Sequence, residues 1–500
     1  MGERTADPNQ GRDIAALAKG GRTNFFGFLL RLAARLPFLF IAGRIYGAST
    51  LGRFAYAVLV VEFAAQLATL GLKRGLAQQL SRADDPHVNV VADALLAGMI
   101  ASMGVAAVLM VFPQAMFPNS QINGLELLLP LIIFAVAGSD IALAALAYRL
   151  DIGATVRARS IIEPWTISIA AFALSYYSLR DGLILSYVLS MVAALAASLY
   201  PLWRSYGLPQ GWRPHPARLL QLARQNVPLA AADAIEWASR RIDIAILGLF
   251  FSPAIVGIYY VAQQVASLPQ KLKTSFDPIL GPVITRNLEE GNKKAVAKQV
   301  AQVGFWIIAA QIGIALALGI PGEAVLGLVG PKFVGGNTAL AFLLAAEVVA
   351  ATAAVSESAL VYTARHRNLM ISMGMIVVQV ALTFAMVFLL RSMDFSKLHQ
   401  AAGPAIALML ALGIASIVKA WLLSRILGAP VFEWRWAVVW ATVVAATIGF
   451  VATRVPEWSE LALGLPLILL SYGYIIWTRG FGPDDRALFR KVETQPLPEP

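Results

Sequence analysis

The sequence contains no cysteine and few charged residues. Only 14% of its 500 residues are charged and 58% are hydrophobic, whereas a soluble domain has about 25% charged residues. Because there is no thiol, disulfide bonds, thiolate metal ligands and a cysteine nucleophile are excluded. The shortage of charge excludes a surface that faces water over the whole chain, so we expect one integral membrane domain.

Catalytic and metal-binding motifs are also missing. The four histidines, His87, His215, His366 and His399, all fall in predicted loops, which argues against a histidine metal site within the membrane. The chain has no phosphate-binding loop, zinc-protease motif or nucleophile elbow. Residues 1–22 lack the apolar segment of a cleaved secretory signal. We therefore expect no enzyme, no cofactor and no metal site.

Long apolar stretches recur along the whole chain. A helix needs roughly 20 mostly apolar residues to cross a bilayer, and these stretches predict an all-α membrane protein with about fourteen transmembrane helices. The predicted spans are 24–47, 53–72, 90–112, 125–148, 160–178, 183–203, 227–250, 254–272, 301–320, 337–364, 369–390, 401–424, 436–453 and 458–478.

Lysine and arginine are distributed unevenly between the two sides of this map. Of the 40 basic residues, 28 lie in one set of alternate loops and tails, 7 lie in the other loops, and 5 lie within spans. Cytoplasmic loops carry the excess of positive charge, so both termini are predicted to be cytoplasmic. Topology also explains the formal net charge of +11, and we do not expect nucleic acid as a partner.

Two halves of the chain resemble each other at a constant spacing. Gly52 matches Gly257, and Arg35 matches Arg240, both at an offset of 205 residues. Each half has six spans, and an even number predicts two lobes in parallel orientation about an axis along the membrane normal. The predicted division is a cytoplasmic tail (1–22), an N-lobe (23–203), a cytoplasmic linker with a basic amphipathic helix (204–226), a C-lobe (227–428), two additional spans (429–478) and a cytoplasmic tail (479–500).

The seventh predicted span carries five charged residues. They are Asp233, Glu236, Arg240, Arg241 and Asp243. On one continuous helix, all of them except Arg241 would share an arc of about 80°. A mid-span charge costs roughly 2.5–3.5 kcal/mol, so this face must meet protein or a water-filled cavity. A neutralised structural network and a functional face that lines a cavity both fit this pattern.

Charged residues also occur in other predicted spans. Arg31 and Arg35 lie one helical turn apart on the first span, which has no acidic residue. Arg31 can snorkel to the inner surface, but Arg35 needs a partner from another helix, from water or from a substrate. Single acidic residues are candidates for pairing with an arginine or for binding a coupling ion, H⁺ or Na⁺: Glu62, Asp140, Glu347 and Glu357.

Four segments resemble bacterial polysaccharide transporters and lipid-linked oligosaccharide flippases of the multidrug/oligosaccharidyl-lipid/polysaccharide (MOP) superfamily. In the first half these are Arg-Ile-Tyr-Gly-Ala-Ser-Thr-Leu-Gly-Arg-Phe-Ala-Tyr-Ala (44–57) and Leu-Gly-Leu-Lys-Arg-Gly (70–75). In the second half they are Arg-Arg-Ile-Asp-Ile-Ala-Ile-Leu-Gly (240–248) and Val-Gly-Ile-Tyr-Tyr-Val-Ala-Gln-Gln (256–264). The pattern of spans extends the resemblance over most of the chain.

The resemblance implies two six-helix lobes around a central cavity, followed by two C-terminal helices. It implies a transporter that flips undecaprenyl-pyrophosphate-linked oligosaccharide repeat units across the bacterial inner membrane by alternating access, for surface or exopolysaccharide synthesis. In such proteins cavity arginines meet the lipid diphosphate, and Arg31, Arg35, Arg240 and Arg241 fit that role here. The implied partners are the lipid-linked oligosaccharide, membrane lipids, and a polysaccharide polymerase with its export machinery, and the chain is expected to be monomeric.

Two other functions remain open. A cation-coupled exporter of drugs or small metabolites would use the same fold, but it should have an acid-rich cavity, whereas the first span has basic residues only. A membrane polysaccharide polymerase or ligase would need a large polar outer loop to hold glycans, whereas the predicted outer loops are short.

Overall fold

The computed structural model describes residues 36–482 and 485–486, except for residues 83–84, 119, 150, 210, 240, 275–283 and 285. All regular elements in this part of the chain are helices, which confirms the predicted all-α class. The physical reason is that lipid cannot hydrogen-bond to the backbone, whereas a helix satisfies its own amides and carbonyls.

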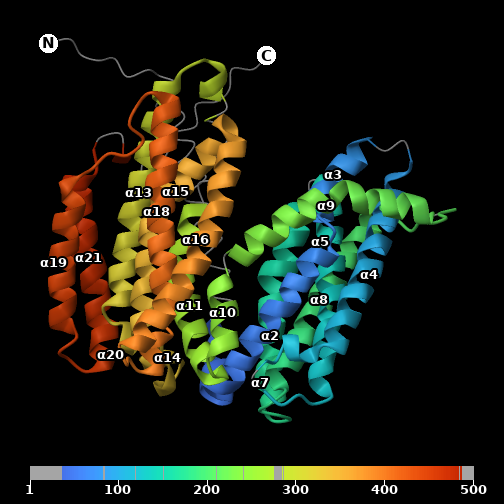
Figure 1. Ribbon diagram of the computed structural model, residues 1–500, viewed down its shortest axis with the longest axis horizontal. Coiled ribbons are helices and arrows are strands. Elements are labelled where there is room, and N and C mark those ends of the chain that lie inside the picture. Colours follow the sequence, from blue (N-terminus) through green and yellow to red (C-terminus); the bar gives the residue numbers. More distant parts are fainter. Residues whose placement is uncertain are drawn as a thin grey trace. The chain divides into compact units, whose positions relative to one another are not determined.

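The chain divides into two compact units (Figure 1). We call the described residues up to Tyr260 the first unit and those from Val261 the second unit. The first unit contains η1 (Ala42–Tyr46), α2 (Gly47–Ala68), α3 (Leu72–Arg82), α4 (His87–Val111), η2 (Pro113–Ala115), η3 (Leu125–Leu131), α5 (Ile132–Tyr148), α6 (Ile152–Thr155), η4 (Val156–Ile162), α7 (Glu163–Ser175), α8 (Gly182–Tyr206), α9 (Pro216–Ser239), α10 (Ile242–Phe250) and the start of α11 (Pro253–Thr274).

The second unit continues from α11. It contains α13 (Lys293–Gly319), α14 (Gly322–Val329), η5 (Pro331–Gly336), α15 (Asn337–Thr363), α16 (Arg365–Ser392), α17 (Lys397–Gln400), α18 (Gly403–Leu427), α19 (Trp436–Ala452), α20 (Glu457–Ser459), η6 (Glu460–Gly464), α21 (Leu465–Ile475) and η7 (Ile476–Gly480). The unit boundary falls within α11, and the lobe boundaries predicted from the sequence stay a prediction.

Several helices are long enough to cross a bilayer. Among the described residues, nine helical segments have the length and hydropathy of a membrane span. One of these segments, Leu36–Arg82, is interrupted at Gly47, where the first predicted span ends. Gly47 has a φ of 80° and separates η1 from α2. Positive φ is a conformation that glycine adopts at little cost. The map of about fourteen spans is compatible with these helices.

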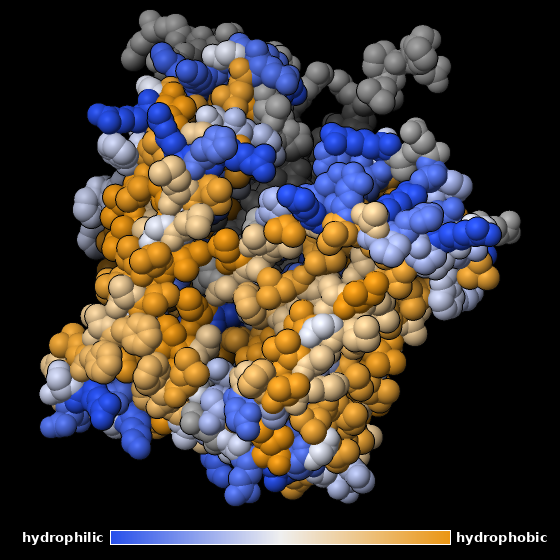
Figure 2. Space-filling model, turned by 45° about the vertical axis from the view of Figure 1, so that its right-hand side comes forward, coloured by the Kyte–Doolittle hydropathy of each residue, from blue (hydrophilic) through white to orange (hydrophobic). Residues whose placement is uncertain are grey.

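The surface of the described helices matches lipid rather than water. On the face shown in Figure 2, hydrophobic residues cover the middle of each unit, and hydrophilic residues collect toward its ends. Large apolar side chains such as Val377, Phe450 and Leu470 are more than 60% exposed. Small polar groups pair inside instead, as where the hydroxyls of Ser139 and Ser198 lie 2.9 Å apart. This is the burial pattern of a multi-pass membrane protein.

The seventh predicted span is interrupted. The structure has α9, which contains the predicted amphipathic stretch, and a separate α10 that begins at Ile242. Between them, Arg241 has a non-helical backbone with φ −135° and ψ 8°. The prediction of one unbroken helix over 227–250 is therefore wrong. Consequently, the charged residues before and after the break do not share one helical arc.

Two glycines allow α2 and α11 to pack closely within the first unit. A Cβ atom on Gly52 would lie 1.8 Å from the Pro253 carbonyl oxygen, and one on Gly257 would lie 2.0 Å from the Ala48 carbonyl oxygen. Both contacts are with backbone, so any larger side chain would force the helices apart. The repeat offset of 205 residues pairs Gly52 with Gly257 and Ala48 with Pro253, so equivalent residues of the repeat meet each other here.

Candidate functional site

A polar chamber of about 450 Å³ lies within the first unit. Its charged lining residues are Glu62 on α2, Lys73 on α3, Asp140 on α5, Arg159 on η4 and Glu163 on α7. Charges are rare inside membrane proteins and mark substrate or ion pathways by default. This chamber is therefore the candidate functional site in the described part of the chain.

Glu62, which lines the chamber, has two hydrogen-bond partners. Arg241 donates to one carboxylate oxygen of Glu62, and the Tyr187 hydroxyl donates to the other at 2.6 Å. The guanidinium of Arg241 also lies over the Trp237 ring, 4.7 Å from its centroid. The loop between α9 and α10 places Arg241 here, so the break in the seventh span is what brings it to α2. An arginine has five N–H donors, and Glu62 uses only part of this capacity.

A second group of charges in the chamber is centred on Arg159. This side chain pairs with Asp140 and, at 3.1 Å, with Glu163 one turn later. Lys73 approaches the second oxygen of Asp140 at 3.8 Å and is half exposed. The Arg159 side chain is only 22% exposed, so the two carboxylates compensate the charge that would otherwise be unpaired away from water.

Two of the three acidic residues of the interrupted span, Asp233 and Asp243, have partners of their own and are not among the residues that line the chamber. Asp233 on α9 is buried and accepts from Arg74 at 2.8 Å. Asp243 in the first turn of α10 is 1% exposed and accepts a 2.8 Å hydrogen bond from the Tyr259 hydroxyl. Each acid therefore has its own partner in the first unit.

The second unit has its own ion pair, formed by a buried lysine and a half-exposed glutamate. Lys419 on α18 is 4% exposed and donates to Glu357 at 2.9 Å and to Ser372 at 3.0 Å. Glu347 is buried on α15. Glu347 therefore belongs to the interior of the second unit, whereas the Glu357 side chain is 46% exposed.

The structure brings together only some of the predicted site residues. It joins Glu62 to Arg241 and places Asp140 in the same chamber. Arg31, Arg35 and Arg240 lie outside the described residues, and Glu236 lies on α9. The predicted arginine site for a diphosphate therefore stays a prediction.

Sequence reasoning missed Lys73, Arg159, Glu163 and Tyr187. The first two fall in predicted inner loops, and Glu163 lies at the start of a predicted span. One local signal was available, because Arg159 and Glu163 are four residues apart and of opposite charge, which is the spacing of a helical ion pair. Nothing local to the sequence indicates that Tyr187 meets Glu62, 125 residues earlier.

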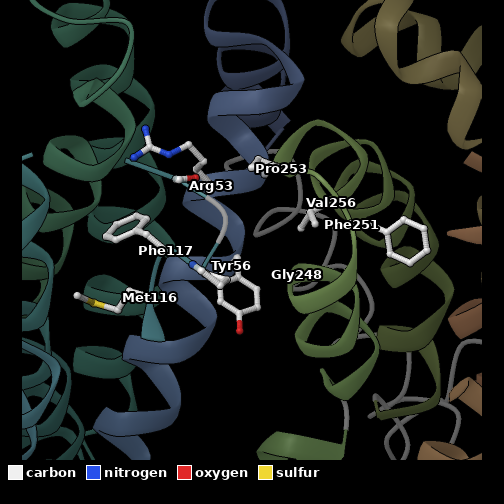
Figure 3. A pocket seen from close by; sticks show the side chains of 11 residues that line it. Arg53, Tyr56, Met116, Phe117, Gly248, Phe251, Pro253 and Val256 are labelled. Atoms are coloured by element: carbon white, nitrogen blue, oxygen red, sulfur yellow. The ribbon is translucent and has the colours of Figure 1, made fainter. Parts of the chain in front are cut away.

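A much smaller cavity lies beside the crossing of α2 and α11 (Figure 3). Its volume of about 20 Å³ has room for about one water molecule. Tyr56 lies against Gly248 of α10, whereas Arg53 lies over the Phe117 ring, 5.4 Å from its centroid. Arg53 also pairs with the buried carboxylate of Glu126. This cavity is a small gap between packed helices and is too small for a substrate.

Solved structures of membrane transporters share this fold. The lipid II flippase MurJ in an inward closed conformation matches with a TM-score of 0.70 and 10% identity, over 91% of this chain and 98% of that one. An inward-facing multidrug resistance MATE family transporter of the MOP superfamily matches with a TM-score of 0.62 and 15% identity, over 80% and 98%. An outward-facing one matches with a TM-score of 0.55 and 13% identity, over 83% and 96%. These matches define the class: the chain has the fold of MOP superfamily transporters.

The match to a sequence family is more specific than the matches to the fold. The family described as "Polysaccharide biosynthesis protein" matches residues 27–288, which is more than half of the chain. The chain belongs to this family, and the predicted likeness to MOP superfamily transporters is confirmed at the level of the fold. No curated protein matches the chain.

Proposed function

We propose that the protein flips undecaprenyl-pyrophosphate-linked oligosaccharide repeat units across the bacterial inner membrane by alternating access, for surface or exopolysaccharide synthesis. The observation that carries this proposal is the family match over residues 27–288, because it links the transporter fold to polysaccharide biosynthesis. The likeness to a lipid II flippase supports the same class of substrate. Both termini would then be cytoplasmic, as the distribution of positive charge predicts.

The charge distribution fits such a substrate. A diphosphate binds guanidinium groups through pairs of charge-assisted hydrogen bonds, and Arg31, Arg35, Arg240 and Arg241 are the proposed binding residues. Arg241 retains donors beyond those that Glu62 uses. A wet, polar interior removes the cost of taking the glycan head through hydrocarbon. A coupling ion, H⁺ or Na⁺, remains a hypothesis, with Glu62, Asp140, Asp233, Glu236, Asp243, Glu347 and Glu357 as its candidate sites.

The test is complementation of polysaccharide export in a strain that lacks the gene. We expect Arg35→Ala and Arg240→Ala to lose most export at wild-type protein levels, and the Lys replacements to lose less because they keep the charge. Arg391→Ala is the matched control, since Arg391 is exposed at the end of α16 and lies on a predicted outer loop. Full export by both Ala variants would contradict the proposed arginine site.

A cation-coupled exporter of drugs or small metabolites is the second candidate, because the MATE transporters share the fold. The two functions differ in what a deletion strain loses. Loss of polysaccharide with unchanged drug susceptibility supports the flippase. Increased susceptibility to cationic drugs with normal polysaccharide supports the exporter.

A further inference from the structure

Arg241, one of the arginines proposed to bind the substrate diphosphate, is already paired with an acidic residue. It donates to one carboxylate oxygen of Glu62, and this pair has no net charge. The Arg241 side chain is still 43% exposed, and its guanidinium lies over the Trp237 ring, so the group is both accessible and oriented. The positive charge that a diphosphate needs on Arg241 is therefore balanced by Glu62.

A diphosphate on Arg241 would meet the charge of Glu62. The two anions would share one guanidinium, and like charges repel strongly in a membrane interior, where little water screens them. This repulsion disappears if Glu62 becomes neutral when the diphosphate binds. A carboxylate becomes neutral by taking up one proton from water, which forms an O–H bond on one of its oxygens.

The surroundings of Glu62 suit both of its protonation states. The Tyr187 hydroxyl donates to the carboxylate at 2.6 Å. A hydroxyl can also accept, so Tyr187 can receive a hydrogen bond from a neutral Glu62. The Glu62 side chain lines the polar chamber and is 23% exposed. Water in the chamber can therefore deliver the proton.

The other charged groups that line the chamber with Glu62 are engaged with one another. They are Lys73 on α3, Asp140 on α5, Arg159 on η4 and Glu163 on α7, and they form ion pairs among themselves. A proton needs only one carboxylate, whereas a hard metal cation needs several oxygen ligands. The described residues contain no group of three His, Cys, Asp or Glu that could hold a metal ion. A proton is therefore the neutralising ion that this site favours.

We propose that Glu62 is a switch that couples binding of the diphosphate to uptake of a proton. Without substrate, the Glu62 carboxylate is paired with Arg241. When the diphosphate binds to Arg241, Glu62 takes up one proton and keeps its hydrogen bond with Tyr187. The proposal rests on the proposed function and selects one coupling ion, H⁺, and one site from its candidates. Glu62 acts on the substrate through Arg241, so it is a positioning residue.

Calorimetric titration of the full chain in nanodiscs tests the switch. The probe is geranyl methyl diphosphate, which has one alkyl group on each phosphate, so its charges do not titrate near neutral pH. If one proton is taken up on binding, the dissociation constant should rise about tenfold for each unit of pH. Titrations in buffers of different ionisation enthalpy should count about one proton taken up per bound probe.

Removal of the titratable group should remove both effects. Glu62→Gln keeps the size of the side chain but cannot take up a proton near neutral pH. We expect this variant to bind the probe with a dissociation constant that does not change with pH. At alkaline pH it should bind about tenfold more tightly than the wild type, because the charge of Arg241 is no longer balanced. Glu289→Gln, at an exposed acidic residue before α13, is the matched control and should keep the wild-type slope. A melting curve of each variant checks the fold.

The outcomes separate the switch from the function on which it rests. Binding of the probe without proton uptake in the wild type, or an unchanged slope in Glu62→Gln, would overturn the switch and leave the flippase in place. Binding that requires Na⁺ instead of H⁺ would also overturn it. Failure of the probe to bind the wild type and both variants would overturn the switch and count against the proposed function. Flipping of a lipid-linked glycan in vesicles then tests that function independently.

Discussion

Charged side chains of the first unit find their partners far away in the sequence. Glu62 is paired with Arg241, 179 residues later, and accepts from Tyr187, 125 residues later. Glu62 lies in an apolar predicted span, where an unpaired charge costs free energy, so the sequence indicates that its carboxylate needs a partner. It cannot show which side chain supplies the compensation, because this depends on how the helices pack.

Removal of one hydroxyl tests this network. Tyr187 is 6% exposed and donates to a carboxylate, so Tyr187→Phe should lower the free energy of unfolding by about 1.5–3 kcal/mol. The measurement is denaturant unfolding of the purified protein. Tyr472→Phe is the matched control, since the buried Tyr472 hydroxyl has no hydrogen-bond partner among the described residues. Its removal should leave stability unchanged or raise it, and an equal loss in both variants would contradict the role of the Glu62 bond.

At the scale of the helices, two elements depart from a regular pattern of spans. The seventh predicted span breaks between α9 and α10, and Arg241 at this break pairs with Glu62 of α2. The crossing of α2 and α11 is close because glycines meet backbone there. Composition predicts helices in both places, but the break and the crossing depend on contacts with other helices.

The crossing can be tested with one methyl group. Gly257→Ala puts a Cβ atom 2.0 Å from the Ala48 carbonyl oxygen. Because this contact is with backbone, the two helices must move apart, and we expect a loss of at least about 1–3 kcal/mol in the free energy of unfolding. Gly104→Ala on α4 is the matched control, because nothing lies within 4 Å of its added Cβ. That change should stabilise the helix by about 0.5–1 kcal/mol. Thermal unfolding of both variants measures the difference, and a neutral Gly257→Ala would refute the close crossing.

At the scale of the whole chain, Asp485, near the end of the described residues, forms hydrogen bonds with residues that lie much earlier in the sequence. Asp485 accepts from Trp306 on α13 at 2.9 Å and from Arg435, just before α19, at 2.6 Å. Burial alone would raise the pKa of Asp485, but hydrogen bonds from Arg435, the Gly482 amide and Trp306 outweigh it and hold the pKa below its usual value. This segment lies outside the spans, and its contacts anchor the end of the second unit.

The lowered pKa gives a pH dependence with a definite sign. Asp485 stabilises the folded protein fully above its unfolded pKa of about 3.9, and this contribution is lost as the pH falls below that value toward the folded pKa. Asp485→Asn should lose about 1–3 kcal/mol near neutral pH and lose less than the wild type on acidification. Asp394→Asn, exposed with a φ of 56°, is the control and should change stability by less than about 0.5 kcal/mol. Parallel pH profiles for the wild type and Asp485→Asn would contradict this account.

The sequence by itself determined the class, the helices and the cost of particular charges. Apolar length and composition are local properties, and they predict membrane helices wherever they occur. The internal repeat also aligned Gly52 with Gly257, and the structure brings these two glycines into contact. Only the tertiary structure decided the pairing of Glu62 with Arg241, the entry of Lys73 and Arg159 into the chamber, and the break before Ile242. These depend on contacts between residues far apart in the chain, which no local pattern of hydropathy or charge contains.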